Sequence, residues 1–406
     1  MLGAGTKRSL VVFWGCVCIV FANVARDQTL SGRFFPEKQT YLVGEPVFVD
    51  FEIVNAGDQT TWIDSRMGEP CIERDPIQVV GAKYQGFGSD TSFGCFGGVA
   101  GSCMSNPIEL KPNEKHIERI FLSARFLLDH AGTYDVQARR LVPLYPQGTW
   151  TPEKGAPKMD FSSDFPITLV AGSEDELKAA FQPYVEEANS PDKSGKWQAI
   201  WAINEMAPPF LEDLILRLAD TPNSADPSAL RRLNTERSRQ KLAQLTEDPR
   251  YRTGRQIAIR ELAEIRDRSY LPVLIRVARS STDGDRDIAI QGTGLLGGDD
   301  AVPFLVSMLG DVDVYARVAA VRGLGLTASR KAVTVLVGLL GQKDDRIFRE
   351  VTQSLAQLTH RSITPTPWSE KPSTAKYNRW HDWWLAHGPT APIYGTDQCA
   401  QPQPLD

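Results

Sequence analysis

The sequence predicts a multidomain protein of two fold classes, an all-β region followed by an all-α region. Short period-2 segments recur between residues 28 and 172, helical periodicity begins after Gly172, and a 31-residue repeat runs through residues 257–340. Of the 406 residues, 42% are hydrophobic and 23% are charged, which excludes a disordered chain, a collagen and a protein with several membrane spans. The net charge of -5 gives no reason to expect nucleic-acid binding.

Residues 1–25 have the features of an export signal. Lys7 and Arg8 precede an apolar run that ends at Ala22, and Val20 with Ala22 forms a site for a signal peptidase. The run is too short to cross a bilayer as a helix. We therefore expect a protein exported to the periplasm or outside the cell, with no transmembrane span after cleavage. An uncleaved anchor or a lipid anchor is the alternative.

Cleavage would leave four cysteines. They are Cys71, Cys95, Cys103 and Cys399. An even number of cysteines in an exported chain favours disulfides over catalysis, and four allow three connectivities. A bridge between Cys95 and Cys103, or from Cys71 to one of them, is favoured over a pair with the distant Cys399. The alternative is that one or two thiols remain free and buried.

Residues 28–172 have the pattern of a β-sandwich, since about seven short strands are expected and turn residues separate them. In the segment Pro46 to Val54, alternation puts the apolar residues on one face and turns Asp50 and Glu52 to the other. The further expected strands are Thr60 to Ile63, Ile77 to Tyr84, His116 to Phe126, Thr133 to Val142 and Phe161 to Val170.

The segment Asp129 to Tyr134 (DHAGTY) is similar to the tyrosine corner of immunoglobulin-like domains. With Tyr41 to Val47 (YLVGEPV) and Val54 to Gly57 (VNAG), it resembles immunoglobulin-like modules of bacterial exported proteins, including the fold of the intracellular proteinase inhibitor family. The resemblance implies an immunoglobulin-like sandwich in which the Tyr134 hydroxyl bonds back to the preceding loop. It implies no catalytic residues.

The stretch from Gln85 to Asn106 is rich in glycine and serine, with phenylalanines between them. Long connections without secondary structure of their own are often functional or disordered. A disulfide could hold these phenylalanines at the surface as a contact site. The alternative is a strand connection whose phenylalanines fold onto the sandwich.

Residues 173–362 are expected to form stacked helix pairs. Ser173 to Glu176 is a capping box, and Asp226 with Pro227 marks the start of a polar helix that runs to about Leu245. Two helices are expected between them, Lys196 to Met206 and Pro209 to Ala219. The segment Asp220 to Arg252 breaks the period and is interpreted as an irregular insert.

A 31-residue step links equivalent positions of successive helix pairs. It connects Ala258, Ala289 and Ala320, then Ile259, Ile290 and Val321, and then Leu274, Leu305 and Leu336. Gly292 and Gly294 likewise match Gly323 and Gly325, and such small residues permit close approach of neighbouring helices. Repeats of this kind bury their apolar faces by stacking.

These units resemble HEAT-like repeats of the short bacterial type, which also occur in phycobilin lyase-like repeat proteins. The resemblance implies a HEAT-like α-solenoid and a role in binding or scaffolding, and it assigns no chemistry. A lyase activity does not fit, since bilin attachment takes place inside the cell and this chain is expected to be exported.

Basic residues are concentrated between Arg231 and Arg268, where ten arginines and Lys241 stand against six acidic residues. Such a surface could bind another protein or an acidic component of the cell envelope. The alternative is a set of solvated helix faces with internal ion pairs. The candidate partner residues are Arg231, Arg232, Arg237, Arg239, Arg255 and Arg260.

Residues 363–390 are expected to cap the solenoid. A helix from Lys376 to His387 would present Trp380, Trp383 and Trp384 at i, i+3 and i+4, and this stripe would cover the last repeat. An aromatic platform for a ligand is the alternative. Residues 391–406 are expected to form a flexible tail unless Cys399 ties them down.

The sequence contains no motif of a known catalytic class, and its five histidines are scattered. We therefore expect no catalytic residues, no metal and no cofactor, and a non-enzymatic scaffold that binds a protein partner in the cell envelope. The oligomeric state is left open. One alternative is a proteinase inhibitor that uses the loop at 85–106, and another is a hydrolase of envelope polymers.

Overall fold

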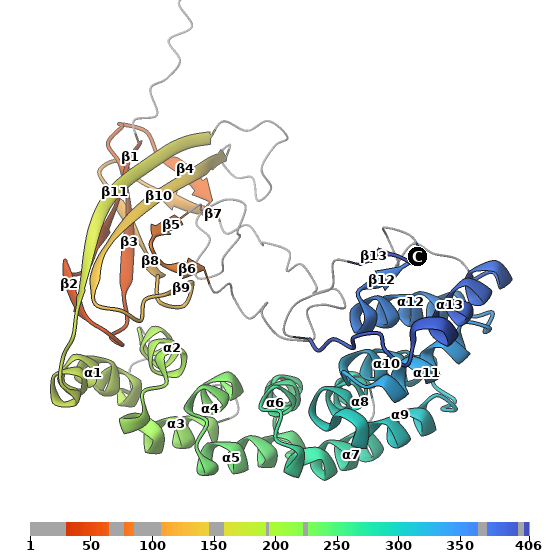
Figure 1. Cartoon of the computed structure of the whole chain (residues 1–406). Coiled ribbons are helices and arrows are strands. Elements are labelled where there is room, and N and C mark those ends of the chain that lie inside the picture. The colour runs from red at the N-terminus through yellow and green to blue at the C-terminus, as the bar shows by residue number, and fades with distance from the viewer. Residues whose placement is uncertain are drawn as a thin grey trace, which may run out of the picture.

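The computed structural model contains an N-terminal region of strands and a long C-terminal array of helices (Figure 1). The residues it describes are 30–64, 77–84, 107–145, 158–191, 195–221, 226–281, 283–363, 372–396 and 402–405. The export signal, the four remaining cysteines and the loop at 85–106 therefore lie outside the described residues, and the predictions made for them stay predictions.

The N-terminal strands form two main sheets, and β6 pairs with β9 in a small two-stranded sheet. A three-stranded antiparallel sheet has the order β1-β3-β8, and a six-stranded sheet has the order β2-β11-β10-β4-β7 with β5 also paired to β10. The strands are β1 (Leu30–Pro36), β2 (Thr40–Leu42), β3 (Phe48–Asn55), β4 (Thr61–Asp64), β5 (Ile77–Val80), β6 (Lys83–Tyr84), β7 (Pro107–Leu110), β8 (Lys115–Phe121), β9 (Phe126–Leu127), β10 (Gly132–Tyr145) and β11 (Lys158–Val170). The larger sheet is mixed, since β2 runs parallel to β11.

The two sheets bury one apolar core between them. The alternation expected in β3 is present, since Val49, Phe51 and Ile53 are at most 1% exposed. The rings of Phe51 and Phe161 lie 5.9 Å apart and join the two sheets. A Cβ at Gly32 would lie 2.8 Å from the Phe161 ring, so β1 needs glycine at this position.

The C-terminal helices stack in an arc, with α4, α6, α8 and α10 on its inner side and α5, α7 and α9 on its outer side (Figure 1). Short 3-10 turns η2 (Pro209–Leu211), η3 (Arg268–Tyr270) and η4 (Gly298–Ala301) precede α3, α7 and α9. The helices are α1 (Glu174–Asn189), α2 (Lys196–Met206), α3 (Glu212–Ala219), α4 (Pro227–Leu233), α5 (Glu236–Glu247), α6 (Arg252–Glu264), α7 (Leu271–Ser280), α8 (Asp283–Gly297), α9 (Val302–Met308), α10 (Val314–Leu326), α11 (Arg330–Leu339), α12 (Asp345–Thr359) and α13 (Thr374–His387).

The 31-residue step corresponds to buried positions of the helical core. Ala258, Ala289 and Ala320 on the inner helices are 0% exposed, and so are Leu274, Leu305 and Leu336 on the outer helices. Ala229 and Leu230 of α4 are also 0% exposed, and they stand 29 residues before Ala258 and Ile259. The stack therefore extends upstream of the strict 31-residue period.

The segment interpreted as an irregular insert contains a regular helix pair, so this interpretation was wrong for its described residues. The single polar helix expected to run to about Leu245 is two helices, α4 and α5. Asn234 ends α4 in the left-handed region at φ 48°, which asparagine tolerates, and the Thr235 hydroxyl caps α5. A spacing of 29 residues in place of 31 hid this pair from a fixed-period comparison.

An aromatic cluster joins the sheets to the first helices. Phe48 of β3 and Phe121 of β8 stack with their ring centroids 4.4 Å apart, and Trp201 of α2 meets the Phe121 ring edge-on at 5.0 Å. Phe48, Phe121 and Ala202 are all buried in this cluster. The strand region therefore stands on α1 and α2 through an apolar interface.

The C-terminal segment closes the far end of the helical array. Strands β12 (Arg361–Ser362) and β13 (Gln403–Pro404) pair in parallel, and Leu405 is 3% exposed. Arg330 donates to the carbonyl oxygen of Ala391 at 2.7 Å, and Arg379 donates to that of Leu405 at 2.9 Å. The described residues of 391–406 therefore differ from the flexible tail that the sequence predicts, because an apolar anchor and arginine side chains hold them on the last repeat.

Candidate functional site

Most of the arginines predicted to form a partner surface contact carboxylates from neighbouring helices. Arg232 of α4 binds Glu205 of α2 at 2.6 Å, and Arg255 of α6 lies 3.3 Å from Asp285 of α8. The remaining pairs are Arg231 with Glu261, Arg237 with Glu212 at 2.9 Å and with Asp213 at 2.8 Å, and Arg239 with Glu236 at 3.2 Å. Arg260 is also engaged in a contact. Their role in binding a partner stays a prediction. The pairs of Arg231, Arg232, Arg237 and Arg255 join neighbouring helices, whereas the pair of Arg239 with Glu236 lies within α5.

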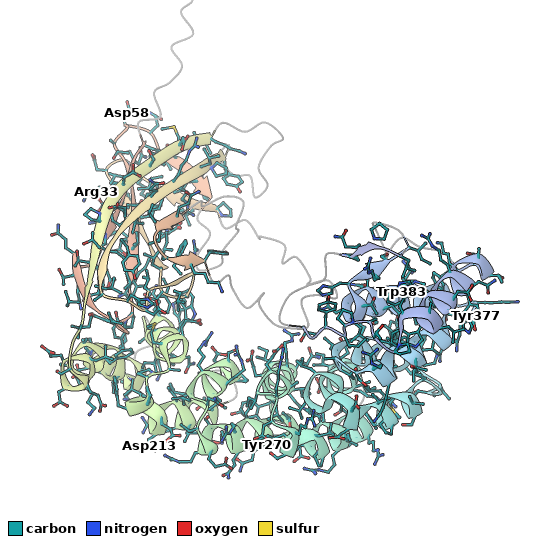
Figure 2. All side chains as sticks on the ribbon, in the orientation of Figure 1. Arg33, Asp58, Asp213, Tyr270, Tyr377 and Trp383 are labelled. Atoms are coloured by element: carbon teal, nitrogen blue, oxygen red, sulfur yellow. The ribbon has the colours of Figure 1, made fainter. Side chains whose placement is uncertain are left out.

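The excess of positive charge counted along the sequence is compensated in space. Glu205, Glu212, Asp213 and Asp285 all lie outside the segment from Arg231 to Arg268, yet they contact arginines within it. Figure 2 shows Asp213 on the outer side of the arc, away from the inner face. A count along the chain does not detect this neutralisation, because the partners belong to adjacent helix pairs.

The inner side of the last repeats has a hollow of about 420 Å³ between α8, α10 and α12. Its lining residues recur at helical spacing, which puts them on one face of each helix. The α10 face is mainly apolar, and the α12 face supplies arginines. The lining residues are Asp287, Gln291, Val314, Tyr315, Val318, Ala319, Arg322, Arg346, Arg349, Glu350 and Gln353.

An ion pair crosses this hollow from α10 to α12. Arg322 Nε donates to Glu350 Oε2 and Arg322 Nη2 donates to Glu350 Oε1, each at 2.7 Å. This paired hydrogen bonding raises the pKa of the Arg322 guanidinium above its usual value. The pair is neutral as a unit, so the charge available to a ligand comes from the other arginines.

Arg346 and Arg349 of α12 have weaker contacts than Arg322. Arg346 Nε lies 3.9 Å from the carboxylate of Asp344, and 54% of its side chain is exposed. Arg349 Nε donates to the backbone carbonyl oxygen of Asp345 at 3.2 Å, and among the residues that the structure describes it has no ion pair with a carboxylate. These two guanidinium groups can therefore bind an incoming anion.

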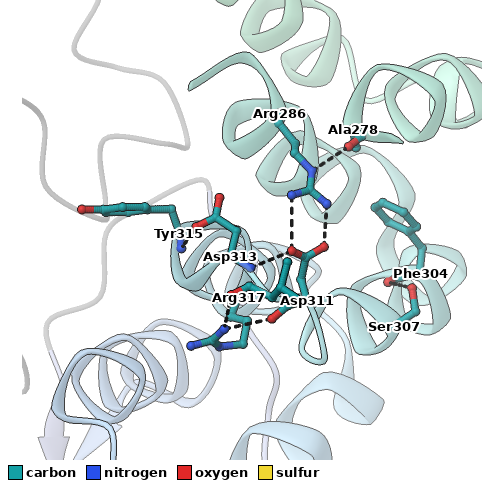
Figure 3. A network of polar contacts seen from close by, with 9 residues as sticks. Ala278, Arg286, Phe304, Ser307, Asp311, Asp313, Tyr315 and Arg317 are labelled. Carbon is teal, nitrogen blue, oxygen red and sulfur yellow. Dashed lines mark hydrogen bonds and ion pairs between the residues drawn. The ribbon is translucent and has the colours of Figure 1, made fainter. Parts of the chain in front are cut away.

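The loop beside the hollow and the first turn of α10 present apolar side chains to solvent. Val312 is 98% exposed and Tyr315 is 64% exposed. Asp311 and Asp313 hold the loop in place: Asp311 Oδ1 accepts from the Asp313 amide and Asp313 Oδ1 accepts from the Tyr315 amide, each at 2.9 Å (Figure 3). The loop is thus fixed in its exposed position.

Two arginines fasten this loop to the repeats on either side. Arg286 of α8 binds the Asp311 carboxylate at 2.5 Å and also donates to the Ala278 carbonyl oxygen at 3.2 Å (Figure 3). Arg317 Nη1 donates to the carbonyl oxygens of Asp311 at 2.9 Å and Val312 at 3.1 Å. Arg255, Arg286 and Arg317 are 31 residues apart, so the repeat itself places them.

Sequence reasoning missed this hollow, although the repeat carried a signal for it. Arg260, Gln291, Arg322 and Gln353 follow each other at steps of 31 residues, and the last three line the hollow. Arg260 was identified as a candidate partner residue because it lies in a basic segment, and not because of its place in the repeat. Extending its position by the repeat step would have located the inner face.

A second hollow, of about 280 Å³, lies where the strands meet α2. Arg119 Nη2 donates to Glu37 Oε2 at 2.8 Å, and Arg119 Nη1 donates to Gln198 Oε1 at 3.4 Å. Burial raises the pKa of Asp50 to about 6, and the negative charge of Glu37 adds to this effect. The half-buried Asp50 carboxylate is therefore a destabilising charge at neutral pH.

The substitution Asp50→Asn is expected to stabilise the protein above pH 6. The native Asp50 favours folding while it is protonated, and this contribution is lost as the pH rises from about 4 through about 6. Because solvent screens a half-exposed group, we expect a gain of about 1 kcal/mol at pH 8 and none at pH 4. Urea unfolding at the two pH values measures the difference.

Asp58→Asn is the matched control, since it removes one carboxylate from an exposed turn at the far tip of the same strand region (Figure 2). Asp58→Asn should leave the difference in the free energy of unfolding between pH 4 and pH 8 as in the wild type. An equal gain for Asp50→Asn at pH 4 and pH 8 would contradict the assignment of the titration to Asp50.

The aromatic residues of the C-terminal helix are packed against the last repeat. Trp380 is 1% exposed and Trp383 is 6% exposed, and Trp384 Nε1 donates to Thr334 Oγ1 of α11 at 3.3 Å. Figure 2 shows Trp383 among the helices at this end of the arc. The Trp380 ring is enclosed by packing, whereas Trp383 lines a hollow of about 510 Å³ together with His360 and Tyr394, so the alternative of an aromatic platform stays a prediction.

Tyr134, the residue expected at a tyrosine corner, lies at the start of β10. Its hydroxyl donates to the carbonyl oxygen of His130 at 3.0 Å, four residues upstream. Among the described residues, no group of three or more histidine, cysteine or acidic side chains is placed to hold a metal ion. None of the described helices is both long enough and apolar enough to cross a membrane.

A sequence profile of HEAT repeats matches residues 285–356, which include most of α8 and all of α10. The crystal structure of an engineered protein is 19% identical, with a TM-score of 0.20, over 45% of this chain and 81% of that one. The comparison with curated proteins gave no match. The C-terminal half of the chain is therefore helical and carries HEAT repeats, and the matched repeats contain the hollow between α8, α10 and α12.

Proposed function

We propose that this protein is an exported scaffold of the cell envelope that binds another protein on the inner face of its HEAT repeats. HEAT repeats serve as protein-interaction scaffolds. The observation that carries the proposal is the hollow between α8, α10 and α12, which combines an apolar wall, arginines and the exposed Tyr315. Tyrosine and arginine dominate the binding energy of many protein interfaces.

The proposal includes the finer features expected from the sequence. Lys7 and Arg8 before an apolar run support export, and the hydrogen bond from Tyr134 to the His130 carbonyl supports an immunoglobulin-like domain. The repeats are proposed to be of the short bacterial type. The strand region, which rests on α1 and α2 through buried aromatic rings, would then serve as a fixed base for the binding face.

Photo-crosslinking from position 315 tests the proposal. Replacing Tyr315 with p-benzoylphenylalanine puts a reactive group at the edge of the hollow, on a side chain that is 64% exposed. In cells that make the full chain, we expect a discrete crosslinked protein that mass spectrometry identifies. The added substitution Arg322→Glu should abolish this product, because it disrupts the ion pair that crosses the hollow.

Val306 provides the matched control position. It lies on α9, on the outer side of the arc, and is 42% exposed. The same photo-reactive residue at position 306 should give no such product. Identical products from both positions would show that the contact is not confined to the inner face, and no product from position 315 would contradict the proposal.

A further inference from the structure

The charges around the hollow between α8, α10 and α12 are unevenly compensated. The two carboxylates among its lining residues have basic partners, since Glu350 binds Arg322 and Asp287 lies in the field of Arg286 and Arg322. Within the described ranges, the ion pair of Arg346 is with a distant carboxylate at 3.9 Å, and Arg349 contacts a backbone carbonyl oxygen. The α12 wall is therefore cationic, and it complements a ligand with a carboxylate.

The opposite wall of the hollow has a different chemistry. On α10, Val314, Val318 and Ala319 line it, and the exposed Tyr315 extends the apolar surface. A purely anionic polymer would leave this wall without a partner, whereas a large apolar side chain would bury it. The apolar wall of α10 therefore faces the cationic wall of α12 across the hollow. The Arg322–Glu350 pair joins these two helices.

The apolar contact is also fixed before binding. Val312 lies in the loop before α10 and Tyr315 in the first turn of α10, and Arg286, Arg317 and the two aspartates hold this junction in place. Binding to such a fixed backbone avoids the entropic cost of ordering it. A short segment with few contacts can therefore bind here.

We infer that the hollow selects an extended acidic peptide segment in which an aspartate or glutamate stands next to a large apolar residue. Arg346 and Arg349 bind the carboxylate, and the α10 wall receives the apolar side chain. The inference rests on the proposed function, and it narrows the partner to proteins that expose such a segment.

Peptide display on the immobilised full chain tests this specificity. A random dodecapeptide library is selected against the wild type, and affinities of the recovered peptides are measured by fluorescence anisotropy. We expect enriched peptides to pair aspartate or glutamate with leucine, phenylalanine, tyrosine or tryptophan. Their affinity should fall about tenfold or more in the Arg346→Glu, Arg349→Glu double variant, because charge-assisted hydrogen bonds are lost.

The matched control is the Arg276→Glu, Arg279→Glu double variant. These arginines have the same three-residue spacing on the outer helix α7, and the Arg276 side chain is 58% exposed, close to the 54% of Arg346. Affinity should stay within about twofold of the wild type, as expected for surface charges outside an interface. Polyglutamate, which has no apolar residue, should bind at least about tenfold more weakly than the selected peptides.

Several outcomes would overturn the inference. They are a selection without enrichment, enriched peptides without acidic residues, equal binding to the Arg346→Glu, Arg349→Glu variant, and polyglutamate binding as tight as that of the peptides. If any of these occurs while crosslinking from position 315 still yields a partner, the specificity is wrong and the scaffold function stands. If crosslinking fails as well, both are wrong.

Discussion

Replacing Gly294 with alanine is expected to lower the free energy of unfolding by about 3 kcal/mol or more. A Cβ at this position of α8 would lie 2.0 Å from the carbonyl oxygen of Gly323 in α10. The obstacle is backbone and cannot rotate away, so the two helices must separate. Thermal and urea unfolding of the full chain measure the loss.

Gly338→Ala is the matched control for this prediction. Gly338 lies in α11, is exposed, and has no atom within 4 Å of an added Cβ. Alanine is favoured over glycine within a helix by about 1 kcal/mol, so this variant should be neutral or slightly more stable. Equal effects of the two substitutions would show that helix propensity, and not close approach of α8 and α10, determines the result.

The helical region could be predicted from the sequence because it is built of repeats. Repeats put equivalent residues in equivalent surroundings, so the 31-residue step identified buried positions such as Ala258, Ala289 and Ala320. The prediction failed where the period changed. Ala229 and Leu230 occupy the same kind of position in α4, but the 29-residue spacing made this pair look like an irregular insert.

The candidate site was harder to predict than the fold. A count of charges along the chain pointed to Arg232 and Arg237, whose carboxylate partners Glu205 and Asp213 lie in other helix pairs. Charge compensation across repeats depends on spatial neighbours, which a linear count does not include. The hollow at α12 has fewer basic residues, but carboxylates neutralise their charge less completely. Only the structure shows this difference between the α12 arginines and those of the basic segment.

The strand region was partly predictable, because alternation along a strand shows which of its faces is buried. The alternation in β3 identified its core face, because one side of a sheet in a sandwich is buried. The strand β1 was missed, since Gly32 and Pro36 weaken its β pattern. Gly32 is required because the Phe161 ring occupies the place of a side chain, a contact that the sequence does not reveal.

Replacing Trp380 with alanine is expected to lower the free energy of unfolding by about 3–5 kcal/mol. Trp380 is 1% exposed and meets the Trp383 ring edge-on at 5.8 Å. Its Nε1 is buried and has no hydrogen-bond partner in the described part of the chain, so the ring contributes through packing alone. Urea unfolding measures the loss, and hydrogen exchange should show reduced protection of α11 and α12, which the cap covers.

Two further variants determine whether the effect comes from the cap. Leu385→Ala removes an apolar side chain from the same helix, but Leu385 is 67% exposed, so its effect should stay within about 0.5 kcal/mol. Trp380→Phe keeps an aromatic ring and loses no hydrogen bond, so it should recover part of the stability. If Trp380→Ala and Leu385→Ala unfold alike, α13 does not act as a cap. If Trp380→Ala lowers stability without reducing protection in α11 and α12, the cap would stabilise only itself, because in a stacked array each repeat depends on its nearest neighbours.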